Sequence, residues 1–216
     1  MKIPAISKTF NKKTVLDLPE LSLSEGRITA VIGPNGSGKT TFAKILAKVE
    51  KSDKKNDPLA GVSVGYMPQR SIAFRMSAEK NVLLNGSDKE KAAKLMETLN
   101  LASVAKERAK KLSGGETAKM ALARILMGNY DLLILDEPSA SMDMESTLAC
   151  EELIKEHCRN TGCAVLLITH SLQQARRIAD DVIYLKNGLL VEKGSASELL
   201  TAPKMPETRR FLDFYG

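Results

Sequence analysis

The chain has 216 residues, of which 43% are hydrophobic and 27% are charged, a composition typical of a globular protein with a substantial core. Its longest aliphatic runs, "LLIL" at 132–135 and "AVLLI" at 164–168, are far shorter than the roughly 20 apolar residues of a membrane span. The net charge of +6 suits nucleic acid, an anionic membrane surface or an anionic ligand, but the chain has no Trp, four Tyr and five Phe, and its lysines are spread out, so we expect no nucleic-acid partner.

The three cysteines, Cys150, Cys158 and Cys163, have neither metal-type nor redox-type spacing. The N-terminal stretch "MKIPAISKTFNKK" has no apolar region of the kind found in secretion signals. Together these features predict a reducing compartment, the cytoplasm, in which the cysteines serve as small apolar core residues.

The first half of the chain begins with alternating strand and helix signals. "RITAVIG" at 27–33 and "VSVGYMPQ" at 62–69 are predicted strands, and "TTFAKILAKV" at 40–49 carries apolar residues on one helical face. From 77 to 111 the chain is charged and helical in pattern, with no strand signal. We therefore expect a helical subdomain, at approximately 70–112, inserted in the α/β core.

The second half continues the alternation. A helix is predicted from Ser113, where Glu116 completes a capping box, followed by a strand at 131–138, a helix at 144–160, a strand at 163–170 and a helix at 172–180. Asn187-Gly188 indicates a hairpin within 181–194, and Ser195 opens a final short helix. No linker or repeat interrupts the pattern, so residues 1–216 are predicted to form a single α/β domain.

The stretch "GPNGSGKT" matches G-x-x-x-x-G-K-[ST] through Gly33, Gly38, Lys39 and Thr40, between a predicted strand and a predicted helix. Glycines let successive backbone N–H groups surround phosphate oxygens, and the helix N-terminus favours the negative charge. Lys39 can reach the terminal phosphates, and the Thr40 hydroxyl can bind Mg²⁺. A plain glycine turn is the alternative, but it would not explain the lysine, the threonine and the flanking elements together.

The stretch "LLILDEP" delivers Asp136 to the end of a buried strand, where ligands bind in parallel α/β sheets. Asp136 is expected to hold Mg²⁺. Glu137 follows it, and a carboxylate beside the γ-phosphate can deprotonate the attacking water. The alternative is a charged pair that only caps a strand.

The stretch "LSGGE" at 112–116 is a second helix start suited to an anion. One nucleotide cannot easily use two such helix starts of one chain at its γ-phosphate. A twofold dimer could, with the P-loop of one copy and the Ser113-Gly114-Gly115 segment of the other enclosing the same ATP.

The ordered set "GPNGSGKT", "LSGGE", "LLILDEP" and "ITH" resembles the nucleotide-binding subunit of an ATP-binding cassette (ABC) transporter over nearly the whole chain. This resemblance implies a P-loop NTPase core with a mainly parallel sheet, a small antiparallel β part and a helical subdomain. It also implies that His170 contacts the γ-phosphate, that Gln69 senses Mg²⁺ and water, and that Asp143 crosses the dimer interface. His157, inside a charged helix, is expected to be structural.

The resemblance further places ATP and Mg²⁺ on this chain. Phe10 would stack on adenine, although a core phenylalanine is the alternative. The catalytic residues would be Lys39, Glu137 and His170, and the signature residues Ser113, Gly114, Gly115, Glu116 and Asp143. The nucleotide would contact Phe10, Gly33, Pro34, Asn35, Gly36, Ser37, Gly38, Lys39, Thr40, Thr41 and Gln69, and the metal Thr40, Gln69 and Asp136.

Three departures from the family pattern stand out. Thr117 and Lys119 replace the usual Gln and Arg of the signature helix, Met142 replaces a usual Leu, and the interval from Lys39 to Gln69 is short. Lysine keeps the charge of arginine but loses its two-pronged hydrogen bonding. None of these changes removes a predicted catalytic group.

The pattern therefore predicts a transport ATPase in which ATP closes a homodimer and hydrolysis reopens it. The implied partners are separate membrane permease subunits and an extracytoplasmic solute-binding protein, with the chain on the inner face of the membrane. The stretches "FRMSAEKNV" and "QQARRIADDVIYLKNG" resemble importers of oxyanions such as tungstate or phosphate, or of polar amino acids. The alternative is a non-transport ABC ATPase that acts on nucleic acid, ribosomes or a soluble assembly machinery.

Overall fold

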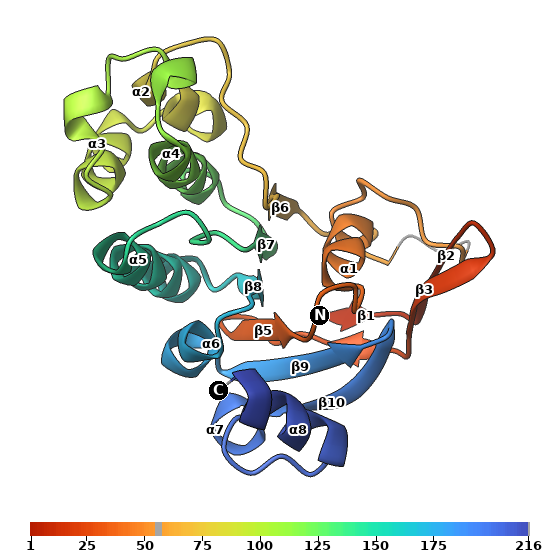
Figure 1. Ribbon diagram of the computed structural model, residues 1–216. Helices are drawn as coiled ribbons and strands as arrows, with labels where there is room; N and C mark the ends of the chain where they lie inside the picture. Colours follow the sequence, from red (N-terminus) through yellow and green to blue (C-terminus); the bar gives the residue numbers. More distant parts are fainter. Residues whose placement is uncertain (55–57, 216) are drawn as a thin grey trace.

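A mixed eight-stranded sheet forms the centre of the protein in a computed structural model that describes residues 1–54 and 58–215 (Figure 1). Its strand order is β2-β3-β10-β9-β5-β8-β7-β6, and β1 and β4 form a separate two-stranded ribbon. The strands are β1 (Lys2–Ile3), β2 (Ile6–Phe10), β3 (Lys13–Leu18), β4 (Leu21–Ser22), β5 (Ile28–Ile32), β6 (Val64–Met67), β7 (Leu132–Asp136), β8 (Ala164–Ile168), β9 (Asp181–Lys186) and β10 (Leu189–Ser195).

The neighbours from β9 through β5, β8 and β7 to β6 all run parallel, whereas β2–β3, β9–β10 and β1–β4 run antiparallel. Every residue of β5, β7 and β8 is buried, as expected of parallel strands covered on both faces. The α/β fold with a mainly parallel sheet and a small antiparallel β part is thus confirmed.

Helices cover both faces of the sheet (Figure 1). The α-helices are α1 (Lys39–Leu46), α2 (Ala78–Val82), α3 (Lys89–Thr98), α4 (Gly114–Leu126), α5 (Met144–Thr161), α6 (Leu172–Ile178), α7 (Ala196–Leu199) and α8 (Pro206–Tyr215), and the 3₁₀ turns are η1 (Leu83–Asn85), η2 (Ala102–Val104) and η3 (Ala109–Lys111). Among the described residues, no helix is both long and apolar enough to cross a membrane.

Local sequence signals explain where several elements begin and end. Ser113 and Glu116 form both hydrogen bonds of the predicted capping box at the start of α4. Helix α5 ends at Gly162, whose φ of 71° is the left-handed geometry that glycine adopts freely. Asn187 and Gly188 have φ values of 51° and 80°, which suit the tight turn of the predicted β9–β10 hairpin.

The segment between β6 and α4 carries helices and turns, and α2 and α3 pack against α4 away from the main sheet (Figure 1). The stretch at 103–111, predicted to be helical, instead forms the short turns η2 and η3. Its backbone bonds to the start of α2, since the Ala78 N–H donates to Glu107 O and the Ala109 N–H donates to Met76 O, both at 2.9 Å. The limits of the helical subdomain, at approximately 70 and 112, stay a prediction.

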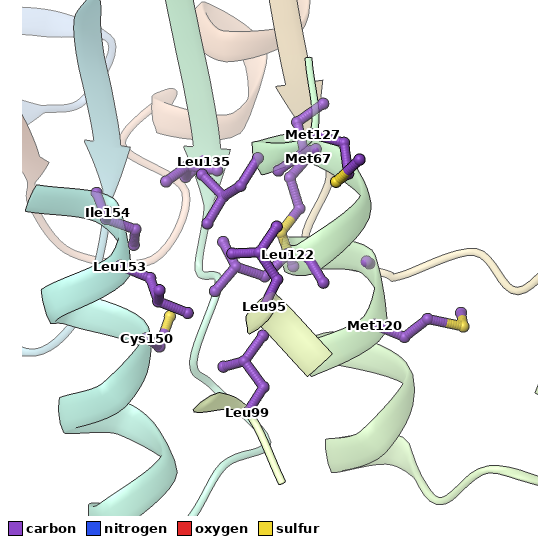
Figure 2. Packing of buried hydrophobic residues seen from close by; sticks show 14 of the residues in the cluster. Met67, Leu95, Leu99, Met120, Leu122, Met127, Leu135, Cys150, Leu153 and Ile154 are labelled. Carbon is purple, nitrogen blue, oxygen red and sulfur yellow. The ribbon is translucent and has the colours of Figure 1, made fainter. Parts of the chain in front are cut away.

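A large apolar cluster joins these helices to the sheet. Figure 2 shows Leu95 of α3, Leu122 of α4 and Leu135 of β7 meeting in one core, and Cys150 and Leu153 of α5 belong to the same cluster. Alternate residues of β7 face the opposite side of the sheet and pack in a second cluster with α1. The position of the signature helix is therefore fixed by burial against both the sheet and the helical segment.

The cysteines behave as predicted, because Cys150, Cys158 and Cys163 are free and at most 3% exposed. Helix α8, in contrast, was not expected, since the helix starting at Ser195 was predicted to be the last. Pro206 at the first helical position is a recognised start signal. The helix is held by Phe211, whose ring stacks on Tyr184 of β9 at a centroid distance of 4.9 Å.

Candidate active site

The predicted phosphate-binding loop, from Gly33 to Thr40, lies between β5 and the first turn of α1, the position that the sequence predicts. Gly33 has a φ of 148°, and a Cβ there would lie 2.1 Å from the carbonyl oxygen of Leu185, so no side chain fits. Gly38 caps α1 with a φ of 97° in the left-handed region. The two glycines therefore permit a backbone path, ending at a helix N-terminus, that can surround an anion.

Lys39 is only 5% exposed, and its Nζ atom donates to Gly33 O at 2.8 Å and to Pro34 O at 3.0 Å. Burial lowers the pKa of Lys39 from its ordinary value, and the neighbouring carboxylates of Glu137 and Asp136 oppose that shift. The ammonium group thus lies across the loop, where it can interact with phosphate oxygens.

Asp136 ends β7 fully buried, and its Oδ2 atom has no hydrogen-bond partner among the described residues. Burial raises the pKa of this carboxyl, while a 3.5 Å hydrogen bond from the Thr40 hydroxyl to Oδ1 opposes the shift. An orphaned carboxylate oxygen beside a threonine hydroxyl fits a hard cation such as Mg²⁺, which prefers oxygen ligands. The described residues hold no group of three or more His, Cys, Asp or Glu that could bind a metal, so phosphates and water would have to complete the coordination.

Glu137 follows β7 in an uncommon left-handed conformation, with a φ of 52°. Its backbone N–H donates to Ile168 O of β8 at 2.9 Å, which anchors the residue to the neighbouring strand. Its Oε1 atom lies 2.6 Å from His170 Nε2, and its Oε2 atom accepts from Gln69 Nε2 at 2.9 Å. Strained backbone that surrounding contacts enforce is often found at functional sites, and here it aims the carboxylate at two other predicted site residues.

A cavity of about 460 Å³ brings most of the predicted residues together. It is lined by Phe10, Val15, Asn35, Gly36, Ser37, Gly38, Lys39, Thr40, Thr41, Gln69, Glu137 and His170. Phe10 is 43% exposed, and Lys8 Nζ lies 4.9 Å from its ring centroid, so the alternative of a core phenylalanine is wrong. The exposed ring at one wall and the loop at another leave room for a nucleotide.

The Ser113-Gly114-Gly115 segment, hereafter the signature segment, does not line this cavity. Ser113 and Gly114 are exposed at the start of α4, where Glu116 donates its backbone N–H to the Ser113 hydroxyl. Gly115 lies close to the loop that follows Glu137, because a Cβ there would come within 2.9 Å of Ser141 O. Asp143, in that loop, accepts a hydrogen bond from the Ser146 N–H at 2.8 Å and caps α5, a role that sequence analysis had not assigned to it.

The structure also locates His157 and the positions at which the chain departs from the family pattern. Thr117 and Lys119 lie half-buried on α4, and Met142 packs partly buried against the main cluster. His157 of α5 is 7% exposed and lies outside the cavity, in keeping with its expected structural role. In the interval from Lys39 to Gln69, residues 55–57 lie outside the described residues, and the described part between α1 and β6 contains no strand.

Sequence reasoning missed several residues near the site. Phe211 and Tyr215 of α8 line a second cavity of about 420 Å³ together with Asn35, Glu137 and His170. No sequence signal ties the C-terminal helix to a loop some 180 residues earlier, so only the fold reveals this neighbourhood. Tyr66 was also missed; burial, with a smaller effect of the nearby Asp136, raises the pKa of its hydroxyl to about 12.

Comparisons with known proteins agree with this geometry. Residues 16–140 match the family profile described as "ABC transporter". Over 204 residues the chain is 34% identical to the tungstate uptake system ATP-binding protein TupC of Peptoclostridium acidaminophilum, covering 87% of this chain and 94% of that one. Over 240 aligned positions it is 30% identical to the arginine transport ATP-binding protein ArtM of Bacillus subtilis, covering 99% and 98%. A dimeric ATP-binding cassette in a post-hydrolysis state, bound to ADP and Pi, has the same fold with a TM-score of 0.78 at 24% identity, covering 90% of this chain and 98% of the other.

Proposed function

The chain belongs to the ABC transporter family and is an ATP-binding ATPase, and from this premise we propose that it drives an importer by closing and opening as a homodimer. The proposal rests on one observation: the sequence motifs of the site occupy two separate places on the chain. The glycine-rich loop, Lys39, Glu137 and His170 line one cavity, and Asp136 lies behind it within 3.5 Å of the Thr40 hydroxyl, whereas Ser113, Gly114 and Gly115 of the same chain do not line that cavity.

Each residue has a role that its position supports. Backbone N–H groups of the loop and the Lys39 ammonium hold the phosphates, and the exposed ring of Phe10 stacks on the base. Thr40 and Asp136 would hold Mg²⁺, with Gln69 nearby, and the ion supplies charge neutralisation at the phosphates when it is bound.

The Glu137 carboxylate accepts a proton from the attacking water, and His170 orients that carboxylate and reaches toward the γ-phosphate. Gln69 holds the second carboxylate oxygen. Because Gln69, Glu137 and His170 follow the neighbouring strands β6, β7 and β8, the sheet itself brings the three side chains together.

The second half of the site comes from another copy of the chain. Ser113, Gly114 and Gly115 occupy a capped helix start with favourable backbone N–H groups, but they do not line the nucleotide cavity of their own chain. In a twofold arrangement each copy offers its signature segment to the partner's ATP, and the loop with Asp143 lies beside that segment. ATP then acts as the contact between the two copies, and its hydrolysis weakens that contact.

The names of the relatives bear on the cargo and on the membrane partners without fixing either. TupC is named for tungstate and ArtM for arginine, so the family match alone leaves the cargo class open. We favour import of a small solute such as an oxyanion through separate permease subunits, supplied by an extracytoplasmic binding protein. The chain would then sit on the inner face of the membrane, where its net charge of +6 suits anionic lipids.

The first test concerns Glu137 and the dimer. The Glu137→Gln variant should lose turnover, by about 10²-fold or more, and should elute as a dimer in ATP and Mg²⁺ but as a monomer in ADP. Hydrolysis by the variant at a near wild-type rate would rule out Glu137 as the base. A variant that stays monomeric with bound ATP would rule out ATP-driven closure.

The second test separates transport from the alternative. Expression with candidate permease genes and purification in mild detergent should yield a stable complex whose ATPase rate rises with the loaded binding protein. A non-transport ABC ATPase acting on nucleic acid would instead show ATPase activity stimulated by DNA or RNA and strongly weakened by salt. That second result would overturn the importer proposal while leaving the ATPase assignment intact.

A further inference from the structure

An ion pair whose carboxylate is buried and whose arginine side chain is 33% exposed joins α5 to α6 close to the candidate active site. Glu151 of α5 is 2% exposed, and its carboxylate accepts from Arg177 of α6 through two hydrogen bonds, Nε to Oε2 and Nη2 to Oε1, each of 2.7 Å. This is the paired geometry in which arginine binds a carboxylate most strongly and with a fixed orientation. The proposed ATPase mechanism does not use either residue.

A third residue links the ion pair to the loop after Glu137. Gln174 of α6 is also 2% exposed, and its side-chain amide donates to Glu151 Oε1 at 3.2 Å and to the Ser139 hydroxyl at 3.0 Å. Ser139 follows Glu137 by two residues. The chain of contacts therefore runs from the ion pair through one amide to the loop of the candidate base.

The same residues border the histidine as well. Helix α6 begins directly after Ser171, which caps it through a hydrogen bond from the Gln174 N–H at 3.1 Å, and His170 precedes that cap. A cavity of about 330 Å³ is lined by Glu137 and His170 and also by Ser139, Gln174 and Arg177. The contacts thus span the two loops that present Glu137 and His170 to each other.

The contacts among Ser139, Gln174, Glu151 and Arg177 are hydrogen bonds and an ion pair, and this bears on what they do. A buried ion pair is weak support for stability, because apolar residues of similar volume often replace one without loss. Its directional bonds, however, fix the relative positions of the groups they join. Glu137 has a φ of 52° and is anchored to β8 through its backbone N–H, so the direction of its carboxylate depends on how the loop that follows it, which contains Ser139, is held.

We propose that Ser139, Gln174, Glu151 and Arg177 form a positioning network that holds Glu137 in register with His170 for ATP hydrolysis. None of the four is a catalytic residue, since they act through the loop and through α6. The inference rests on the proposed role of Glu137 as the base, and the experiment below tests the two separately.

The decisive variants break the link without breaking the ion pair. Ser139→Ala removes only the Ser139–Gln174 hydrogen bond, whereas Gln174→Leu removes that bond and the Gln174–Glu151 bond; both leave the Glu151–Arg177 pair in place. At saturating Mg·ATP we expect each to lower kcat by about three- to tenfold, the range that one hydrogen bond accounts for. The KM for ATP should stay close to the wild-type value, and the melting temperature should fall by no more than the few degrees that one or two lost hydrogen bonds imply.

The double variant provides the sharpest readout. If both substitutions act through the shared Ser139–Gln174 bond, their combination should lower kcat no further than Gln174→Leu does alone. Glu151→Gln, which breaks the ion pair itself, should lower both kcat and the melting temperature. Asp181→Asn is the matched control, because it breaks the Arg27–Asp181 pair (2.9 Å) at the start of β9 and should leave kcat unchanged.

Two outcomes would overturn the proposal. Wild-type kcat in Ser139→Ala and Gln174→Leu, together with a lowered melting temperature in Glu151→Gln, would mean that the ion pair only anchors α5 to α6. Additive losses in the double variant would mean that the two residues do not act through a shared bond. Glu137→Gln is assayed in parallel, since turnover in that variant would refute the role of Glu137 and not the network alone.

Discussion

The Nε2 atom of His170 lies 2.6 Å from the Oε1 atom of Glu137, although the two residues are 33 positions apart in the sequence. The parallel neighbours β7 and β8 end side by side and deliver the two side chains to the same edge of the sheet. Gln69, which follows β6, holds the other carboxylate oxygen. The three residues therefore form one unit at the carboxyl ends of three adjacent strands.

Removing the imidazole of His170 should lower the rate of ATP hydrolysis without unfolding the protein. His170→Ala should lower kcat by about 10²-fold, because Glu137 loses the group that orients it and the γ-phosphate loses a contact. The measurement is steady-state ATP hydrolysis, with the ATP dissociation constant determined separately. The side chain of His170 is 43% exposed, so the melting temperature should hardly change.

His157 supplies a matched control for that variant, since the chain has only two histidines. His157→Gln alters a buried residue of α5 that lies outside the nucleotide cavity, so kcat should stay at the wild-type value. If His157→Gln lowered kcat as much as His170→Ala, the loss would reflect a general disturbance of the fold, and the proposed role of His170 would be wrong.

Two further variants should separate nucleotide binding from dimer closure. Lys39→Ala removes the ammonium group that lies across the loop, so ATP binding itself should be abolished. Ser113→Arg places a bulky cation at the exposed start of α4, outside the chain's own cavity, so a single copy should still bind ATP. Nucleotide affinity is measured by calorimetry and the dimer by gel filtration, both in the Glu137→Gln background. Equal losses of ATP affinity in the two variants would contradict a site shared between copies.

Much of the nucleotide site could be predicted from the sequence because its chemistry is local. The loop from Gly33 to Thr40 and the pair Asp136-Glu137 each need only a strand, a turn and a few residue types in fixed order. The capping box of Ser113 and Glu116 is similarly local, and both of its hydrogen bonds are present. Such features depend little on the rest of the chain, so pattern and position predict them.

Other features depend on contacts between distant segments, which no local pattern encodes. Gln174 reaches Ser139 across 35 positions, and Phe211 and Tyr215 share a cavity with Asn35. The turns at 103–111 were predicted to be helical because their residues favour helix, yet the backbone there bonds to the start of α2 instead. In these places tertiary contacts decide the structure.

The buried carboxylate of Asp136 should cost stability when no cation binds it. Its Oδ2 atom has no partner among the described residues, and burial of an incompletely paired charge is unfavourable. Asp136→Asn removes the charge at nearly constant volume, and the amide oxygen can still accept from Thr40. In EDTA and without nucleotide, the variant should therefore melt a few degrees above the wild type, as a change of about 1 kcal/mol implies for a chain of this size.

The order of stabilities should reverse when Mg·ATP is present. The wild type should gain stability from the bound metal and nucleotide, whereas Asp136→Asn should lose the Mg²⁺-dependent part of that gain and should hydrolyse ATP poorly. Thr40→Val, which removes the neighbouring hydroxyl, is the companion variant and should also lose the Mg²⁺-dependent part of the gain. An equal Mg²⁺-dependent rise in melting temperature for wild type and Asp136→Asn would show that Asp136 is not a metal ligand.

The aromatic wall of the cavity provides the last prediction. Phe10 is 43% exposed at the end of β2, and a ring in that position can stack on the base of the nucleotide. Phe10→Ala should weaken ATP binding by about tenfold, within the range measured for base–aromatic stacking, while kcat at saturation stays close to wild type. Phe10→Tyr should restore the affinity. The affinity for GTP should fall as much as the affinity for ATP, because an aromatic ring can stack on any base.

Phe74→Ala is the control for this variant, since Phe74 is 46% exposed but lies outside the nucleotide cavity. It should leave ATP affinity unchanged. If Phe10→Ala also left the affinity unchanged, the ring would not be part of the nucleotide site. If instead the affinity for ATP fell and the affinity for GTP did not, Phe10 would select the base through a specific contact and not through stacking.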